Sequence, residues 1–373
     1  MKELIEIKNE LLNNSPSQEI KKYIDTIGIN KKRPLGKFNV AYWTIEPVRG
    51  CNLQCGCCAT TLFPKNEYKF IEVNTWLKTI QLIKKLTPYN RIDFANAGEP
   101  TLHPEIYKLL EIGRKESPFS FFEIITNGTM LLKGKVTYKE LFDAGANMIY
   151  VDMYNSSEKH IALAEKSGFH YYIRSQKTKK DPAAWTYHKD VNIKCIVFQN
   201  NPYNWSAMKK RTYFSTFFNN LNWDKAKELG IYPVINPPNR RCNQPFRTVN
   251  ISFDGFYSFC CFDFMRYVYG KIGNIEEGVE GFVNFWIGKY MQDVRKHLHY
   301  KDRLGHPLCK KCSHVSSRGD IPCWDEKVLD FYYENKKWEE NNIKIKTKIP
   351  QPQNKGFFNQ IKKEKSHESK TKE

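Results

Sequence analysis

Apolar residues recur with two different periods along the first two thirds of the chain. Residues 38–48, FNVAYWTIEPV, have the composition of a strand, and the same character returns at 91–98, 119–128 and 146–154. Between these segments the apolar residues repeat at helical spacing, after residue 74, in 104–115 and in 138–145. Strands that alternate with helices in this way predict parallel strands joined by crossover helices.

Local signals mark the ends of the predicted helices. Asn74 is a suitable N-cap for the first one, Pro104 suits the first turn of the second, and Gly145 closes the third. In barrels of this kind, closed or partial, reactive groups lie on the loops at the carboxyl ends of the strands. The conspicuous motifs all follow predicted strands: the cysteine loop, NAGEPTLHP, TNGT, and the polar residues that end the fourth strand.

Composition places few limits on function. The chain has 373 residues with 40% hydrophobic content, enough for one large domain and a smaller one. Of the net charge of +19, residues 341–373 contribute +6, because nine lysines there face three acidic residues. The basicity suits nucleic acid, but no recognition motif accompanies it, so a lysine-rich solvated surface is favoured.

The amino terminus, MKELIEIKNELLNN, lacks the apolar core of a secretory signal, and no stretch approaches 18 uncharged apolar residues. We therefore expect a cytoplasmic protein with no membrane partner. In that compartment thiols stay reduced, so 11 clustered cysteines favour metal binding or catalysis over disulfides.

Four cysteines fall within eight positions in CNLQCGCC, residues 51–58. Cys51, Cys55 and Cys58 have the spacing C-x3-C-x2-C, and Cys57 offers the alternative C-x3-C-x-C. Three thiolates cannot complete a tetrahedral zinc site or ligate all four irons of a cubane cluster, so one metal position stays open to an exogenous ligand. Half of a zinc knuckle is the alternative interpretation.

CNLQCGCC resembles the hallmark of the radical S-adenosylmethionine (radical SAM) superfamily, NAGEP resembles its GGEP loop, and TNG follows the next strand. The resemblance implies a [4Fe–4S] cluster on Cys51, Cys55 and Cys58 whose open iron binds SAM. It also implies that Cys57 packs against adenine or the core, and that alanine at the first glycine of the loop matters only if that position needs a positive φ. The residues it places at the cofactor are Ala97, Gly98, Glu99, Pro100 and Asn127; His103 ends the loop.

A second set of cysteines lies in the last third of the chain. Cys242, Gly255 and Cys260 have the pattern C-x12-G-x4-C, and Cys309 and Cys312 add C-x2-C. Four thiolates close a site, which by spacing alone suits zinc or a cluster. The pattern is similar to the twitch form of the SPASM domain, which implies an auxiliary [4Fe–4S] cluster. Three cysteines are left over: Cys261 and Cys323 as spare candidates, and Cys195 as a core residue in an apolar strand.

In the fourth predicted strand, Ile149, Val151 and Met153 alternate with Tyr150, Asp152 and Tyr154. The alternation sends the first set toward the helices and the second toward the barrel lumen. Asp152 is therefore expected near the cofactor or substrate. Arg174, on the next strand, is a suitable partner for the carboxylate of SAM.

The fold class predicted is α/β: a partial (β/α)6 TIM-like barrel with a small C-terminal iron–sulfur domain of twitch or SPASM type. Its expected organisation is a helical N-terminal extension (1–39), the barrel (40–235), the cluster domain (236–325) and a basic, disordered tail (326–373).

The resemblance implies an enzyme that cleaves SAM to a 5′-deoxyadenosyl radical and abstracts a hydrogen atom from a sugar, a cyclitol or a short peptide. A flavodoxin- or ferredoxin-type protein is the expected electron donor. Two alternatives remain: a peptide-modifying enzyme that cross-links or epimerises, and a zinc-stabilised protein that binds nucleic acid.

Overall fold

The computed structural model describes the central part of the chain. Its residues are 40, 42–53, 60, 64, 67–87, 90–153, 157–174, 192–200, 242, 244–263, 266, 270–286, 288–299, 302–307 and 309. The predicted N-terminal extension and tail lie outside the described residues, as do Cys55, Cys57, Cys58, Cys312, Cys323 and Tyr154.

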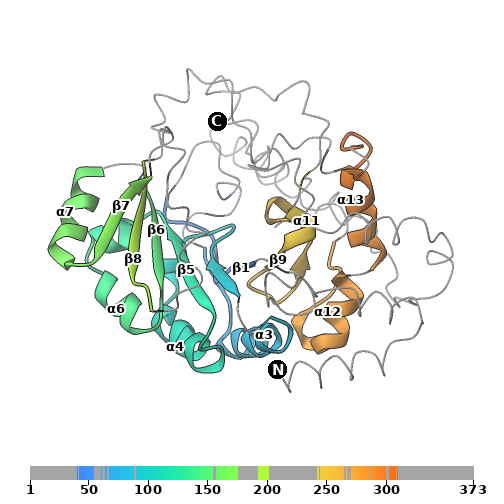
Figure 1. The fold of residues 1–373 in the computed structure, drawn as a ribbon, viewed down its shortest axis with the longest axis horizontal. Helices are drawn as coiled ribbons and strands as arrows, with labels where there is room; N and C mark the ends of the chain where they lie inside the picture. Colours follow the sequence, from blue (N-terminus) through green and yellow to red (C-terminus); the bar gives the residue numbers. More distant parts are fainter. Residues whose placement is uncertain are drawn as a thin grey trace, which may run out of the picture.

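The described strands form one eight-stranded sheet in the order β10-β9-β1-β4-β5-β6-β8-β7, and Figure 1 shows most of them as a curved row. All neighbours are parallel except β9 and β10. The strands are β1 (Tyr42–Ile45), β4 (Arg91–Phe94), β5 (Phe121–Thr126), β6 (Met148–Met153), β7 (His170–Arg174), β8 (Cys195–Asn200), β9 (Thr248–Ile251) and β10 (Tyr257–Ser258). A separate two-stranded ribbon pairs β2 (Val48–Arg49) with β3 (Lys69–Phe70).

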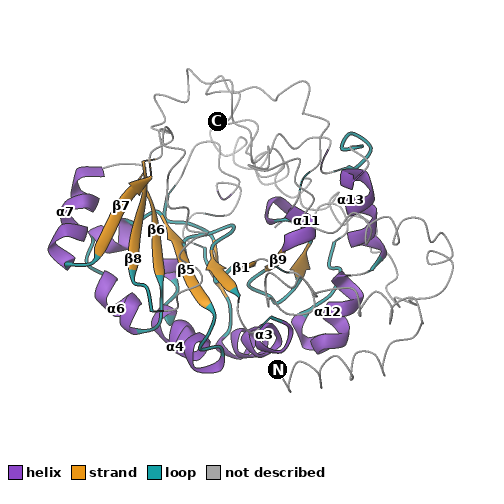
Figure 2. Cartoon of the chain, viewed as in Figure 1, coloured by secondary structure: helices purple, strands orange, loops and turns teal. Residues whose placement is uncertain are grey.

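Helices line the outer face of this row, as Figure 2 shows in purple. The described helices are α3 (Val73–Leu86), α4 (Ile106–Glu116), α5 (Thr129–Leu132), α6 (Tyr138–Asp143), α7 (Ser157–Ser167), α11 (Gln244–Arg247), α12 (Gly278–Trp286) and α13 (Lys289–His299), with 3-10 turns η2 (Pro100–Leu102), η3 (Cys261–Asp263) and η4 (Ile275–Glu277). Those along the outer face are α3, α4, α6, α7 and α12. Every second strand residue points toward them. Trp43, for example, is fully buried, with its ring centroid 5.3 Å from that of Phe282 in α12.

The predicted α/β class is confirmed, and so is the alternation in the fourth strand. Ile149, Val151 and Met153 join the core under the helices, whereas Tyr150 joins a separate cluster on the inner face. The strand order contains one feature that the sequence did not indicate. β8 lies between β6 and β7, so the strand that carries Arg174 is at the edge of the sheet and not beside the fourth strand.

The region after residue 235 continues the same sheet. β9 pairs in parallel with β1, with Thr44 opposite Asn250, and β10 folds back on β9. Gly255 turns the chain between them with φ of +77°, a conformation that favours glycine. The sheet therefore contains strands from both sides of the boundary predicted at 235/236.

The predicted helix starts need two corrections. α4 begins at Ile106 with Glu105 as its N-cap, so Pro104 lies before the helix and not in its first turn. α3 begins at Val73 with Glu72 as its N-cap, not at Asn74. The backbone N–H of Ile71 donates to the carbonyl of Pro47 and that of Trp76 donates to the carbonyl of Glu72, so pairing with the β1–β2 segment sets where the helix starts. Gly145 follows α6 with φ of +124°, as expected of a residue that ends a helix.

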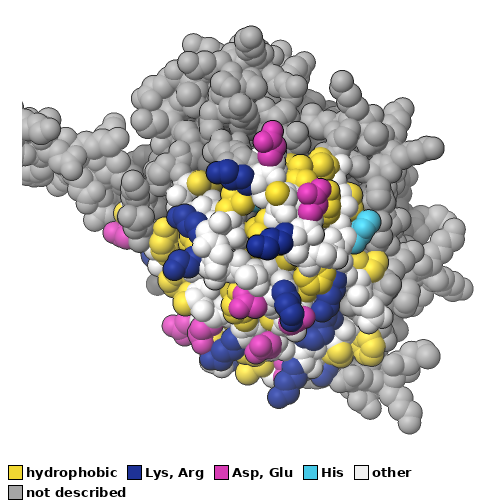
Figure 3. Space-filling model, turned by 90° about the vertical axis from the view of Figure 1, so that its left-hand side faces the viewer, with side chains coloured by type: hydrophobic (Ala, Val, Ile, Leu, Met, Phe, Trp, Pro, Cys, Tyr) yellow, Lys and Arg dark blue, Asp and Glu magenta, His cyan; other side chains and the backbone are white. Residues whose placement is uncertain are grey.

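The surface over β7 and its neighbouring helices carries charges of both signs. In Figure 3, Lys and Arg side chains lie among Asp, Glu and apolar side chains rather than forming one basic patch on this face. Among the described helices, none has the length and apolar content that crossing a membrane requires.

Candidate active site

Three loops meet at the carboxyl end of the sheet, as the sequence predicted. The loop after β1 and the loop after β4 are joined by backbone hydrogen bonds: Gly50 N–H donates to Ala97 (3.1 Å), and Glu99 N–H donates to Gly50 (3.1 Å). These bonds fix the residue immediately before Cys51. The first cysteine is thus positioned by the AGEP loop rather than by its own loop alone.

Gly98 allows this close approach. A Cβ atom at this position would lie 1.9 Å from the carbonyl oxygen of Val48, so no other residue fits without moving the backbone. The positive φ of this loop falls on Asn96 (90°) and not on Ala97, which is buried. Alanine in place of the first glycine of the motif therefore causes no backbone strain.

The sulfur of Cys51 accepts two N–H groups. Leu53 N lies 3.4 Å from it, and Nδ2 of Asn127, from the loop after β5, also lies 3.4 Å away. The same Asn127 amide donates to Oδ1 of Asn52 at 3.0 Å. N–H donors favour the thiolate form of a cysteine, which is the form that binds iron, so this geometry fits a cluster ligand with Asn127 supporting it.

Glu99 joins the second loop to the third. One carboxylate oxygen accepts from Thr101 N (3.0 Å), Thr101 Oγ1 (2.5 Å) and Thr126 Oγ1 (2.6 Å), and the other accepts from Asn127 N (2.7 Å). Burial raises the pKa of the Glu99 carboxyl, although these four bonds oppose the shift. Cofactor contact by Glu99 stays a prediction, but the structure gives its carboxylate a clear role in fixing the two loops.

The other predicted residues are more scattered. Pro100 opens η2 and is buried, and His103 is held through both ring nitrogens, by Ile71 O (3.0 Å) and Glu105 N (3.1 Å). Asp152 and Arg174 both lie opposite Gln199 of β8, which separates them by one strand. Of Arg174 only the backbone is described.

The three described cysteines of the second set, Cys242, Cys260 and Cys309, are buried to the same extent, with 7% exposed, in one hydrophobic core. His306 links two of their segments: its Nδ1 accepts from Cys309 N (3.3 Å), and its ring packs edge-on against Phe259 at 5.6 Å. Within the described part of the chain, no three His, Cys, Asp or Glu side chains form an assembled metal site. The donor chemistry suits a cluster, and ligation stays a prediction.

The leftover cysteines differ from one another. Cys195 is 1% exposed on β8, and burial raises the pKa of its thiol to about 12, which confirms it as a core residue. Cys261 begins η3 and is half-buried near Tyr42. Burial first, and then the nearby Cys261 and Asp93, raise the pKa of the Tyr42 hydroxyl, which donates to Gln244 at 2.9 Å.

Polar residues also line part of the inner face of the sheet. The register places Asn250, Thr44, Asp93 and Glu123 in one row across β9, β1, β4 and β5. Arg91 bridges the two carboxylates, at 2.6 Å from Asp93 and 2.9 Å from Glu123. The Asn250 amide is fully buried, and neither of its polar atoms has a hydrogen-bond partner in the described structure.

Sequence reasoning did not single out Asn52 and Thr126, which join neighbouring loops, or Thr101, which binds Glu99 within one loop. The available signal was their position, because each of them directly adjoins a motif residue. Asn250 was missed because its isolated position in an apolar strand carries no motif.

Comparison with known proteins identifies the class of this site. The model of the radical SAM superfamily matches residues 45–180, and that of an iron–sulfur cluster-binding domain, SPASM, matches residues 242–313. The fold and the cysteine loop thus define a radical SAM domain. The chain carries this domain together with a C-terminal SPASM iron–sulfur domain.

The chain is also similar to individual proteins. The tungsten-containing aldehyde ferredoxin oxidoreductase cofactor-modifying protein of Pyrococcus furiosus is 30% identical over 112 residues, which make up 30% of this chain and 30% of that protein. The crystal structure of BtrN in complex with AdoMet and 2-DOIA shares the fold, with a TM-score of 0.51 and 18% identity over 76% of this chain and 98% of BtrN. Streptococcus suis SuiB bound to precursor peptide SuiA gives a TM-score of 0.38 and 15% identity over 74% of this chain and 70% of SuiB.

A radical SAM domain implies an enzyme that uses a [4Fe–4S] cluster and SAM, and a SPASM domain implies auxiliary iron–sulfur clusters. The cofactors expected from the sequence are therefore confirmed at the level of the family.

Proposed function

We propose that this chain is a radical SAM oxidoreductase that acts on a small hydroxylated molecule such as a sugar or cyclitol. When bound, the cluster and SAM together supply a 5′-deoxyadenosyl radical, formed with methionine by one-electron reduction, which removes a hydrogen atom from the substrate. Oxidation is then completed when the substrate gives up one further electron and a proton. Cys242, Cys260, Cys309 and Cys312 would hold the auxiliary cluster, which when bound would supply an acceptor for this electron.

The single observation that supports this chemistry best is the environment of Cys51. Its sulfur lies where three loops meet and accepts two N–H groups, and Gly50 before it is fixed by the AGEP loop. Asn127 and Glu99 hold the loops, so the site is organised by this chain's own residues before any ligand arrives. Cys55 and Cys58 complete the proposed ligand set.

The inner face of the sheet favours a hydroxylated substrate. Arg91 pairs with Asp93 and with one carboxylate oxygen of Glu123, and the neutral groups of Asn250 and Thr44 lie beside them in the row. An amide and a hydroxyl both donate and accept, as substrate hydroxyl groups do. A buried amide without a partner costs about 1–3 kcal/mol, which a substrate hydroxyl can offset.

The test is anaerobic turnover of the reconstituted chain with dithionite and SAM. We expect 5′-deoxyadenosine, and we expect sugars or cyclitols to increase its rate of formation more than short peptides do. Cys51→Ala abolishes the product, whereas Cys195→Ala, which removes a buried core thiol, retains it. Equal product from Cys51→Ala would refute the proposal, and stimulation by peptides alone would refute its substrate class.

A further inference from the structure

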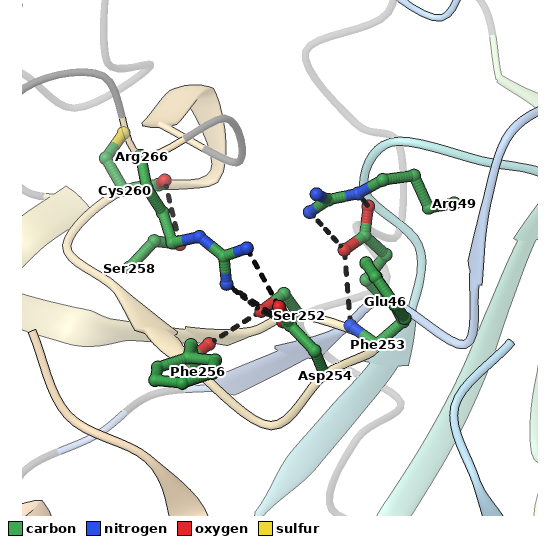
Figure 4. Close-up of polar contacts among 9 residues, drawn as sticks. All are labelled: Glu46, Arg49, Ser252, Phe253, Asp254, Phe256, Ser258, Cys260 and Arg266. Atoms are coloured by element: carbon green, nitrogen blue, oxygen red, sulfur yellow. Dashed lines mark hydrogen bonds and ion pairs between the residues drawn. The ribbon is translucent and has the colours of Figure 1, made fainter. Parts of the chain in front are cut away.

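Glu46 and Arg49, in the segment that leads to Cys51, form a buried ion pair. This pair contacts the region matched by the SPASM model, residues 242–313, which we call the SPASM segment. Glu46 directly follows β1 and its side chain is completely buried. Arg49 donates to both of its carboxylate oxygens, at 3.0 Å and 2.8 Å, and the backbone N–H of Phe253 donates to one of them at 3.3 Å (Figure 4). The backbone of Glu46 also donates to Ile251 of β9, so this residue holds the β9–β10 turn through both backbone and side chain.

The aromatic ring of Phe253 strengthens the same contact. The guanidinium carbon of Arg49 lies 4.8 Å from the ring centroid and Nζ of Lys69 lies 5.8 Å from it, both within the range of cation–π attraction. Arg49 is therefore held between a carboxylate from its own loop and a ring from the SPASM segment. It stands two residues before Cys51, so its position constrains the start of the cysteine loop.

The other side of the turn is tied to the segment that follows Cys260. Arg266 donates to both oxygens of Asp254, at 2.8 Å and 3.0 Å, and to Ser252 Oγ at 2.8 Å (Figure 4). Ser258, on the same hairpin, donates weakly to the carbonyl of Cys260 at 3.5 Å. The turn at residues 252–255 thus contacts both cysteine-bearing segments, one through Glu46 and Arg49 and the other through Arg266.

A buried ion pair adds little net stability compared with a well-packed apolar pair, so its benefit is better sought in the specific geometry it imposes. We propose that Glu46 is a positioning residue that fixes the Cys51 loop against the SPASM turn, so that the state of the auxiliary site affects SAM binding at the first cluster. This inference rests on the proposed function. Asp254 and Arg266 form the second half of the same connection.

The test compares Glu46→Gln with Glu123→Gln. Glu123 is a matched control because it is also a buried carboxylate paired with an arginine, Arg91, but it lies in the middle of the sheet on β5. In the full chain without cofactors, hydrogen exchange in residues 46–53 and 250–256 is expected to accelerate at least tenfold together in Glu46→Gln and to stay unchanged in Glu123→Gln. Acceleration in the turn alone, or equal acceleration in both variants, would overturn the proposal.

The reconstituted protein gives a second, independent readout. Glu46→Gln is expected to raise the KM for SAM in 5′-deoxyadenosine formation at least tenfold and to alter the change in the cluster's EPR spectrum that SAM induces. Cys309→Ala is expected to raise the KM for SAM at least threefold in the wild type but to raise it no further in Glu46→Gln; additive effects on this KM would overturn the proposed connection. If Glu46→Gln does not fold, Glu46→Asp, which keeps the charge and shortens the reach, takes its place. If SAM changes neither the EPR spectrum nor the products of the wild-type chain, but Glu46→Gln still accelerates hydrogen exchange in both segments, the proposed function is refuted. The contact between the Cys51 loop and the SPASM turn is not.

Discussion

The side-chain amide of Asn127 donates to the sulfur of Cys51 at 3.4 Å, although 76 residues separate the two in the chain. This hydrogen bond joins the loops after β5 and β1. Because the same amide also binds Asn52, its direction is fixed by two acceptors. The third motif of the sequence therefore supports the first one directly.

Asn127→Ala is expected to lower the rate of 5′-deoxyadenosine formation by about 10–100-fold, the usual cost of losing an outer partner of a metal ligand. Removing an N–H donor from the sulfur also makes the cluster harder to reduce. Redox titration of the cluster and product assays measure the two effects. Asn192 is an exposed asparagine before β8, so Asn192→Ala serves as the control. An unchanged reduction potential of the cluster in Asn127→Ala would contradict the role of Asn127 as a partner of Cys51.

Gly98→Ala is expected to prevent proper closure of the AGEP loop. Its Cβ would lie 1.9 Å from a backbone oxygen, which cannot move as a flexible side chain could. Iron incorporation and thermal stability should both fall. Gly134→Ala is the matched control, because Gly134 has φ of +64° but open space around it. That variant should lose only about 1–2 kcal/mol, the cost of the left-handed conformation. Equal behaviour of the two variants would show that the close approach is unimportant.

Thr126→Val tests the connection made by Glu99. The hydroxyl of Thr126 donates to the Glu99 carboxylate (2.6 Å) and accepts from Gly128 N (3.0 Å), so valine removes one of the three donors to that Glu99 oxygen and deprives the buried Gly128 N–H of this acceptor. We expect a loss of about 2–4 kcal/mol in the free energy of unfolding, measured in urea. Thr79→Val removes one bond within a helix, to Thr75, at an equally buried site, and should cost about 1 kcal/mol. A smaller loss at Thr126 than at Thr79 would argue against the connection.

His160 is expected to make stability sensitive to acid. Its ring is buried against Gly128, where a Cβ would lie 2.3 Å from Cε1, and burial lowers the pKa of the imidazole. The unfolded chain therefore binds a proton more readily than the folded one. Stability is present above the unfolded pKa of about 6.5 and is lost as the pH falls below it, by up to about 1.4 kcal/mol per pH unit.

Urea unfolding at pH 7.5 and 5.5 measures this effect in the wild type and in His160→Phe. His103 and His306, whose pKa values are also lowered by burial, remain in both proteins, so only the difference between them is assigned to His160. We expect the phenylalanine variant to lose less stability on acidification. The same loss in both would exclude His160 as the source.

The sequence predicted the parts of this fold that depend on local pattern. The alternation in the fourth strand, the end of α6 at Gly145 and the placement of three motifs after three strands all follow from periodicity and turn chemistry. It did not predict that β8 separates β6 from β7, because strand order depends on contacts between distant segments. The start of α3 was misplaced for the same reason, since pairing of Ile71 with Pro47 overrides the capping preference of Asn74.

In the candidate site, the motifs identified one residue of each contact but not the bond that it makes. Cys51 and Glu99 could be named from their spacing, but the bonds from Asn127 and Thr126 depend on loops that meet only in the folded chain. Glu46 had a weak signal, as the one acidic residue in the strand segment 38–48. One of its partners, Phe253, lies 207 residues away in the chain.

The central claim is that three cysteines hold a cluster with one iron open to SAM. The most direct measurement is the EPR spectrum of the reduced, reconstituted chain before and after SAM is added, with iron, sulfide and zinc determined on the same sample. We expect about eight irons per chain, as two cubane clusters require, and a changed spectrum with SAM. Zinc without labile sulfide, or a spectrum that SAM leaves unchanged, would contradict the account.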